Sequence, residues 1–154
     1  MTLPLLALLI GIVAGLRTMT ASAAISWAAY LGWLHLDGTW LAFLGYFWTP
    51  WILTVLALVE LVADQLPSTP SRTVPIQFGA RMVTGAISGA AICAAAGMLV
   101  AGGVAGVMGA VIGTFGGRAA RAKMATAFGR DVPAALIEDV VAIVAAIVIV
   151  RMIQ

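Results

Sequence analysis

This chain has few charged residues for its length. Lys, Arg, Asp and Glu make up 9% of its 154 residues, whereas 63% of the residues are hydrophobic. A soluble domain carries about a quarter charged residues, so this composition indicates an integral membrane protein. The net charge of +2 is small and no basic run appears, so we expect no nucleic-acid partner.

Cysteine and histidine are scarcer still, and this limits the chemistry. Cys93 is the single cysteine, which excludes an internal disulfide and a cysteine metal cluster. His35 is the single histidine, which argues against a histidine-based metal site. The sequence shows no Ser/His/Asp set and no phosphate-binding glycine loop. We therefore expect no enzyme, no metal and no cofactor.

The first apolar segment is too long to be a simple membrane helix. As one helix, residues 3–31 would reach roughly 43 Å, whereas the hydrocarbon core is only ~30 Å thick. The segment must tilt or break, and Gly11, Gly15 and the polar stretch 17–20 mark the expected place. Because Arg17 interrupts the apolar run, we read it as a retained first span and not as a signal peptide.

Apolar segments along the whole chain predict an all-α membrane protein of about five transmembrane helices in a single domain, 1–154. Thr49-Pro50 is typical of a helix start, although a single helix kinked at Pro50 is the alternative. All five tryptophans lie between Trp27 and Trp51, which predicts an aromatic belt at one membrane face. The expected elements after the first span are an interfacial helix at 39–48, a second span at 50–66, an extended loop at 67–75, a hairpin of two spans over 76–122 that turns at 101–103, and a fifth span from Pro133 to Arg151.

Basic residues predict the orientation. With five spans, the N-terminus and the loops 67–75 and 118–131 share one side, and the positive-inside rule makes that side cytoplasmic. The C-terminus would then lie on the opposite, periplasmic or extracellular face. The basic residues that support this arrangement are Arg72, Arg81, Arg118, Arg121, Lys123 and Arg130.

The two ends of the chain resemble each other weakly. A Gly-xxx-Gly pattern precedes Arg17 in the first span and Arg118 in the fourth, and a proline precedes Glu60 in the second span and Glu138 in the fifth. One span separates the two pairs, so they would be oppositely oriented. This pattern is typical of an inverted-topology repeat of spans 1–2 and spans 4–5, which is common in transporters.

Small residues recur at four-residue spacing in the third and fourth spans. This spacing allows two helices to approach closely. The pattern predicts packing of these two spans on each other, and the alternative is a homodimer interface. The glycines concerned are Gly85, Gly89, Gly97, Gly109, Gly113 and Gly117.

Ionisable residues inside membrane spans indicate a functional site or buried ion pairs. Arg17 lies too deep to reach water easily, so it either pairs with Glu60 or Glu138 or contacts an anion at the helix break. In the second case Thr18, Thr20 and Ser22 would supply hydroxyl groups. The candidate substrate or ion site comprises Arg17, Thr18, Thr20, Glu60, Asp64, Arg118, Glu138 and Asp139.

Four short motifs resemble a family of small bacterial membrane proteins that is catalogued as a domain of unknown function. The motifs are Gly15-Leu16-Arg17-Thr18, Gly32-Trp33-Leu34, Glu60-xxx-Asp64-xx-Pro67 and Pro70-xx-Thr73. The resemblance covers most of the chain and implies a bacterial inner-membrane protein without a known substrate. A Lys commonly follows the Asp in this family, whereas this chain has Gln65, so a role for that cation does not carry over.

Together these features predict a transporter or channel for a small solute or ion. Arg17 would contact the substrate, and Glu60 and Glu138 would act as counter-ions or proton carriers. Two alternatives remain at the level of sequence. One is a structural or accessory subunit, whose charges form interhelical salt bridges and which binds itself or a partner. The other is a lipid-handling protein, whose Arg121 and Lys123 meet anionic headgroups of membrane lipids.

Overall fold

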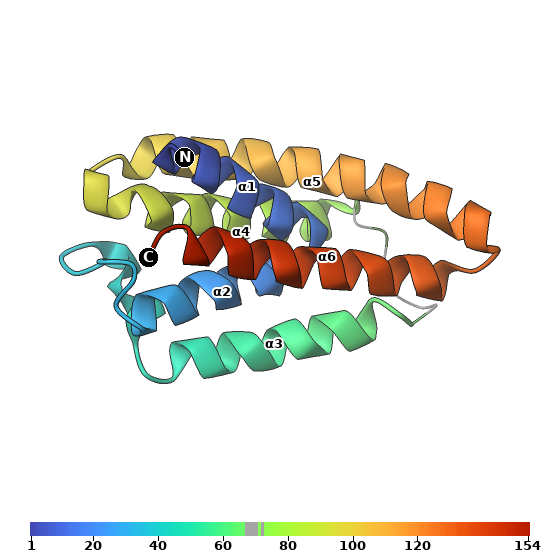
Figure 1. Ribbon diagram of the computed structural model, residues 1–154, viewed down its shortest axis with the longest axis horizontal. Coiled ribbons are helices and arrows are strands. Elements are labelled where there is room, and N and C mark those ends of the chain that lie inside the picture. The colour runs from blue at the N-terminus through green and yellow to red at the C-terminus, as the bar shows by residue number, and fades with distance from the viewer. Residues whose placement is uncertain (67–70, 72) are drawn as a thin grey trace.

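A computed structural model describes residues 1–66, 71 and 73–154, and the regular structure in these residues is helical. The predicted all-α fold is therefore confirmed. Much of the expected loop at 67–75 falls on 67–70 and 72, outside the described part of the chain. In chain order, the elements are α1 (Leu3–Leu16), α2 (Thr18–Tyr30), the 3-10 helix η1 (Trp40–Gly45), α3 (Thr49–Ala63), α4 (Pro75–Cys93), the 3-10 turn η2 (Ala94–Ala96), α5 (Leu99–Phe128) and α6 (Asp131–Arg151) (Figure 1).

Helix length separates the elements into two groups. Among the described residues, α5, α6 and α4 extended by η2 are long and apolar enough to cross a membrane, whereas α1 and α3 are shorter apolar helices. At 1.5 Å per residue, α1 and α2 reach only roughly 20 Å each, less than the ~30 Å of a hydrocarbon core. The first apolar segment is thus broken, as its length predicted.

The break lies at Arg17 and reverses the chain. Arg17 has an extended backbone, with φ −139° and ψ 109°, and belongs to neither helix. The α1 helix runs parallel to α5, because Gly11 lies against Gly106 and Gly15 lies against Gly113. By contrast, α2 runs antiparallel to α3, which itself starts at the same end of the molecule as α5 (Figure 1). Residues 3–30 therefore form a re-entrant hairpin, which enters the bundle and leaves it at the same end.

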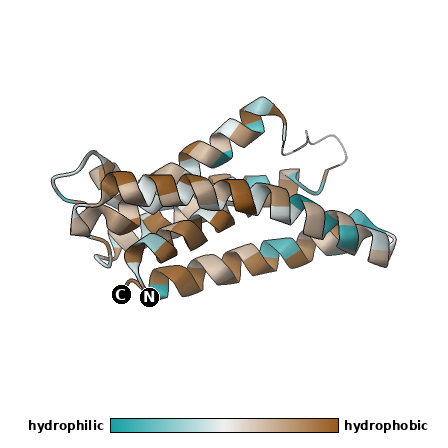
Figure 2. Cartoon of the chain, turned by 90° about the horizontal axis from the view of Figure 1, so that it is seen from above, coloured by the Kyte–Doolittle hydropathy of each residue, from teal (hydrophilic) through white to brown (hydrophobic). Residues whose placement is uncertain are grey.

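As a result, both chain termini lie at one end of the bundle (Figures 1 and 2). The loop between α2 and η1 and the turn between α4 and α5 lie at this end too. The sequence predicted that the N- and C-termini lie on opposite sides of the membrane, whereas the structure brings them to the same end of the bundle. The prediction counted the first segment as one continuous span, and the extended backbone at Arg17 turns the chain back.

We name the two ends of the bundle by their side chains. The aromatic end holds the termini and the five tryptophans, and there Trp27 packs edge-on against Trp51 with 5.1 Å between ring centroids. The basic end lies at the other extremity of α5, where hydrophilic residues gather (Figure 2). Its exposed basic residues are Arg118, Lys123 and Arg130.

The start of α3 agrees with the sequence. Pro50 lies in the first turn of α3, where its missing N–H would have had no helical partner in any case. The single kinked helix through Pro50 is wrong, because η1 ends at Gly45 and Tyr46 is extended. The short helix expected at 39–48 is matched by η1.

The turn between α4 and α5 lies earlier than predicted. It occupies Ala94–Met98, where Gly97 adopts a left-handed φ of +69°, a conformation that glycine adopts without steric cost. The predicted turn at 101–103 is inside α5. Gly102 instead packs on α4, because a Cβ at this position would lie 2.7 Å from the Cβ of Cys93.

Glycines bring three helix backbones into direct contact. Gly89 of α4 packs against Gly106 of α5, where a Cβ would meet the Gly106 Cα at 2.9 Å, and Gly85 packs against Ala110. On another face of α5, a Cβ at Gly109 would lie 2.8 Å from the backbone nitrogen of Ile12 in α1. The predicted packing of the two spans is thus confirmed, and it extends to α1.

The remaining members of the predicted glycine set behave differently. Gly113 also packs on Ile12, and Gly117 is buried in α5. Gly97 lies in the turn with open space around it and does not belong to the packing face. Since Gly85, Gly89, Gly109 and Gly113 already contact helices of the same chain, they are not available for a second copy.

The helices do not support the predicted inverted repeat. The α5 helix is continuous over Leu99–Phe128, whereas its supposed counterpart is the re-entrant hairpin of α1 and α2. The Gly-xxx-Gly similarity reflects a shared packing role, since Gly11 and Gly109 are close neighbours on facing helices.

Candidate functional site

Arg17 occupies the tip of the re-entrant hairpin and is completely buried, with 0% exposure. Its Nη1 lies 2.5 Å from Oδ2 of Asp64 at the end of α3, and its Nη2 pairs with Oδ1 of Asp139 in α6. The side chain therefore ties the tip to two other helices. A charge buried in this way is stable only with such partners.

Two further charged side chains hold the broken helix ends. Glu60 of α3 accepts hydrogen bonds from the backbone N–H groups of Thr18 and Met19, each at 2.8 Å. It thereby neutralises the positive end of the α2 dipole. At the end of α1, Nη1 of Arg81 donates to the carbonyl oxygens of Gly15 at 2.5 Å and Leu16 at 3.0 Å.

This arrangement explains how an interrupted helix survives inside an apolar bundle. Backbone groups left without helical partners cost several kcal/mol in lipid. Here the carboxylate of Glu60 accepts hydrogen bonds from the free N–H groups, and the guanidinium of Arg81 donates to the free carbonyl groups. Thr114 of α5 adds a weaker hydrogen bond to Gly15 at 3.4 Å. The break is thus built by side chains from α3, α4 and α5.

Arg121 of α5 forms a second node next to Arg17. Its Nη1 lies 2.5 Å from the same Oδ2 of Asp64, and its Nε and Nη2 donate to Asp131 at 2.9 and 2.5 Å. Oε2 of Glu138 lies 3.7 Å from the same Nη1. Asp64 therefore bridges two arginines and joins the re-entrant tip to the basic end.

Most of the predicted site residues do come together. Asp64, Glu138 and Asp139 belong to the Arg17–Arg121 network, and Glu60 and Thr18 lie at the start of α2. The predicted pairing of Arg17 with Glu60 or Glu138 is wrong. Glu60 is engaged by backbone N–H groups, and Glu138 lies nearer Arg121.

Two predicted members of the site lie elsewhere. Arg118 is exposed at the basic end. Thr20 is buried in α2, and its hydroxyl has no hydrogen-bond partner among the described residues. The idea of Arg17 as a free anion contact finds no support, since two carboxylates occupy its guanidinium.

Sequence reasoning missed Arg81, Arg121 and Gln65 as members of the site. Nε2 of Gln65 donates to Oδ2 of Asp139 at 3.3 Å. Arg81 is 3% exposed within an apolar span, and its intramembrane position was the signal that could have identified it.

A cleft of about 220 Å³ opens beside the tip. It is bounded by residues of α2, α3 and α4, and half-buried Glu60 forms its charged wall. Its lining residues are Thr18, Met19, Leu56, Val59, Glu60, Gln77 and Ala80. Arg17 itself does not line it, so the cleft reaches the start of α2 and stops short of the buried ion pairs.

Fold and site together define a helical membrane protein whose re-entrant hairpin is held by buried charge. The family follows from comparison with known proteins. The chain belongs to the family described as "Domain of unknown function (DUF4126)", whose model matches residues 5–152. The resemblance found in the sequence motifs is thus confirmed at the level of the family. No curated protein and no solved structure matches the chain.

Proposed function

We propose that this protein transports a small solute or ion across a bacterial inner membrane. The observation that carries the proposal is the re-entrant hairpin, whose tip places two helix ends and Arg17 inside the bundle. Non-helical backbone at membrane depth occurs where it is buried in protein or lines a pathway, and broken helices of this kind surround the substrate sites of transporters.

The ion pairs of Arg17 would form the closed gate of such a pathway. Asp64 and Asp139 come from α3 and α6, so movement of either helix would separate a carboxylate from the tip. Asp64 also contacts Arg121, which offers the carboxylate an alternative partner when it leaves Arg17. The network can thereby exchange partners without leaving a buried charge alone.

Orientation follows from the basic end. The positive-inside rule places Arg118, Lys123 and Arg130 on the cytoplasmic side. Both termini and the tryptophan belt would then lie on the periplasmic side. The cleft beside Glu60 would open within the membrane, between these two faces.

Flux through liposomes tests this proposal. The purified protein is reconstituted, and fluxes of protons, potassium and chloride are followed with fluorescent indicators. The double variant Arg17→Gln/Asp139→Asn removes the gate contact and leaves the net charge of the protein unchanged. It should change the flux at least about tenfold. Arg151→Gln at the aromatic end is the matched control and should leave it unchanged.

A structural role is the second candidate, favoured by the complete burial of Arg17. In that case Arg17→Gln would weaken folding, and neither the wild type nor the folded double variant would carry a flux above that of empty liposomes. A flux that depends on Arg17 in a folded protein would rule this candidate out.

A further inference from the structure

We propose that the cleft beside Glu60 binds a small hydrophobic organic cation, such as a quaternary ammonium, that reaches it from the lipid phase. The inference deepens the proposed function and rests on it for any role in transport. The binding itself is argued from the cleft alone, in three steps that concern its depth, its opening and its chemistry.

The cleft lies deep in the apolar part of the molecule. Glu60 follows Trp51 of the aromatic end by nine residues of the same helix, a rise of roughly 14 Å. This is about half of a ~30 Å hydrocarbon core. A carboxylate at this depth is costly unless it serves a partner or a ligand.

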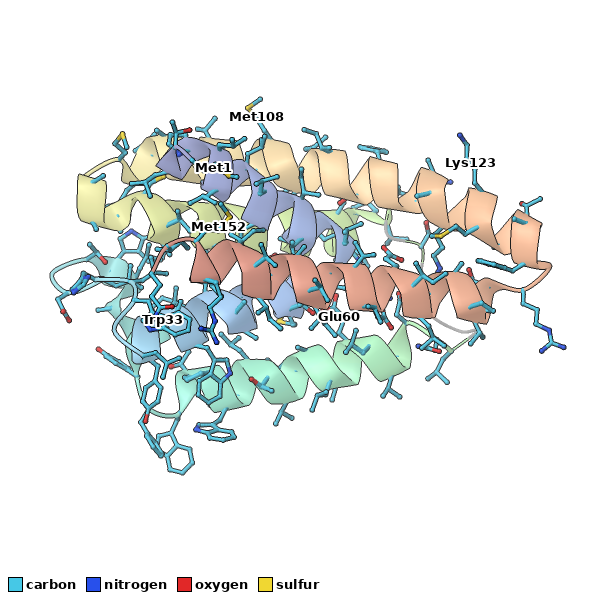
Figure 3. The ribbon with its side chains drawn as sticks, viewed as in Figure 1. Met1, Trp33, Glu60, Met108, Lys123 and Met152 are labelled. Atoms are coloured by element: carbon cyan, nitrogen blue, oxygen red, sulfur yellow. The ribbon has the colours of Figure 1, made fainter. Side chains whose placement is uncertain are left out.

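The cleft opens sideways between helices. The α3 helix packs mainly against α2 and η1, and residues of α3 line the cleft together with residues of α2 and α4. Glu60 extends from α3 towards the bundle (Figure 3). The outer walls, Leu56 and Val59, are 43% and 59% exposed, so a ligand dissolved in the lipid can reach Glu60 without passing through water.

The chemistry of the walls selects the charge of the ligand. Both side-chain oxygens of Glu60 accept a backbone N–H, and each oxygen keeps a second lone pair for another partner. Glu60 already occupies the N–H groups of Thr18 and Met19, so an anion in the cleft would face the carboxylate and find only the neutral side-chain donors of Gln77 and Thr18. A cation gains the attraction of the carboxylate in a medium of low dielectric constant, and apolar groups on it pack against Leu56 and Val59.

Direct binding tests the inference. Protein in nanodiscs of uncharged phosphatidylcholine is dialysed against radiolabelled phenyltrimethylammonium, and tert-butylbenzene serves as the uncharged molecule of the same shape. We expect saturable binding of one cation per chain that tert-butylbenzene competes for poorly. Glu60→Gln should weaken this binding at least about tenfold, as expected when one partner of a charged pair is removed.

Two variants of α4 test whether the cation binds in this cleft. Ala80 lines the cleft, whereas Val83 is exposed elsewhere on α4. Ala80→Phe should abolish binding and Val83→Phe should leave it unchanged, with folding checked for each by circular dichroism and size-exclusion chromatography. Equal binding by both Phe variants, equal affinity for the uncharged analogue, or unchanged binding by Glu60→Gln would each overturn the inference.

The flux assay separates this inference from the proposed function. Binding that depends on Glu60 without any flux would retain the cation site and refute transport. A flux that depends on Arg17, without cation binding, would retain transport and refute the cation site.

Discussion

Neutralising Arg17 provides the strongest test of the buried network. Arg17→Gln removes the guanidinium that now lies 2.5 Å from Asp64 and pairs with Asp139. Asp139 then loses its arginine, whereas Asp64 keeps Arg121. Breaking a buried ion pair from one side costs about 3–5 kcal/mol, a large part of the roughly 5–15 kcal/mol that stabilises a typical domain. We therefore expect Arg17→Gln to be the most destabilising single change at the tip.

A double-mutant cycle isolates the pair itself. Arg17→Gln combined with Asp139→Asn should lose about 1–3 kcal/mol less than the sum of the two single variants, because residues in one salt-bridge network do not act additively. Asp64 keeps Arg121 as a partner in every variant, so the coupling reports on Arg17 and Asp139. The control is Arg151→Gln, whose exposed guanidinium lies 5.3 Å from the centre of the Trp33 ring and should contribute only about 0.5–1 kcal/mol.

The assay is reversible unfolding in mixed micelles, followed by circular dichroism at increasing mole fraction of a denaturing detergent. If the losses in the free energy of unfolding were additive in the cycle, the ion pair would be refuted. It would also be refuted if the free energy of unfolding of Arg17→Gln lay within about 1 kcal/mol of the wild-type value, the range of an exposed salt bridge.

Three further predictions use the same unfolding assay or simple labelling. Gly109→Ala should cost about 1–3 kcal/mol, because the new Cβ would lie 2.8 Å from the backbone nitrogen of Ile12, whereas Gly116→Ala meets open space and should add up to about 1 kcal/mol of helix stability; equal effects would contradict the packing of α1 on α5. Arg81→Met should cost about 1–3 kcal/mol, since it leaves the carbonyl groups of Gly15 and Leu16 without their donor, and a stability equal to wild type would show that the carbonyls find other donors. Cys93 is completely buried, so a maleimide should label it at least tenfold faster in denatured than in native protein, as mass spectrometry would show; equal rates would place Cys93 at a surface.

Composition and helix periodicity were sufficient to predict the membrane class and most helix positions. The excess length of residues 3–31 indicated a break, and the polar stretch beginning at Arg17 located it. The length of this segment does not show that the chain reverses its direction at the break. Whether the chain continues or turns back at Arg17 depends on ψ at one residue and on caps from Glu60 and Arg81, which lie far away in the sequence.

For the site too, the sequence predicted which residues take part but not how they are arranged. Intramembrane acids and arginines were visible in the sequence as a group, and most of them do meet. Their pairing was not predictable, because it depends on rotation of each helix about its axis. Arg118 and Arg121 lie only about 60° apart around the axis of α5, yet Arg118 is exposed and Arg121 is half-buried among the acids. Gly97 was misassigned for a related reason, since four-residue spacing does not show where the helix ends.

The central claim is that the chain turns back at Arg17, and side-specific cysteine labelling tests it most directly. Single cysteines replace Thr2, Asp37, Ala127 and Met152 in a Cys93→Ser background, and intact bacterial cells or inverted vesicles receive a membrane-impermeant maleimide. The structure predicts that positions 2, 37 and 152 react from one side of the membrane and position 127 from the other. Labelling of positions 2 and 37 from opposite sides would show that residues 3–30 cross the membrane, and would contradict the re-entrant hairpin.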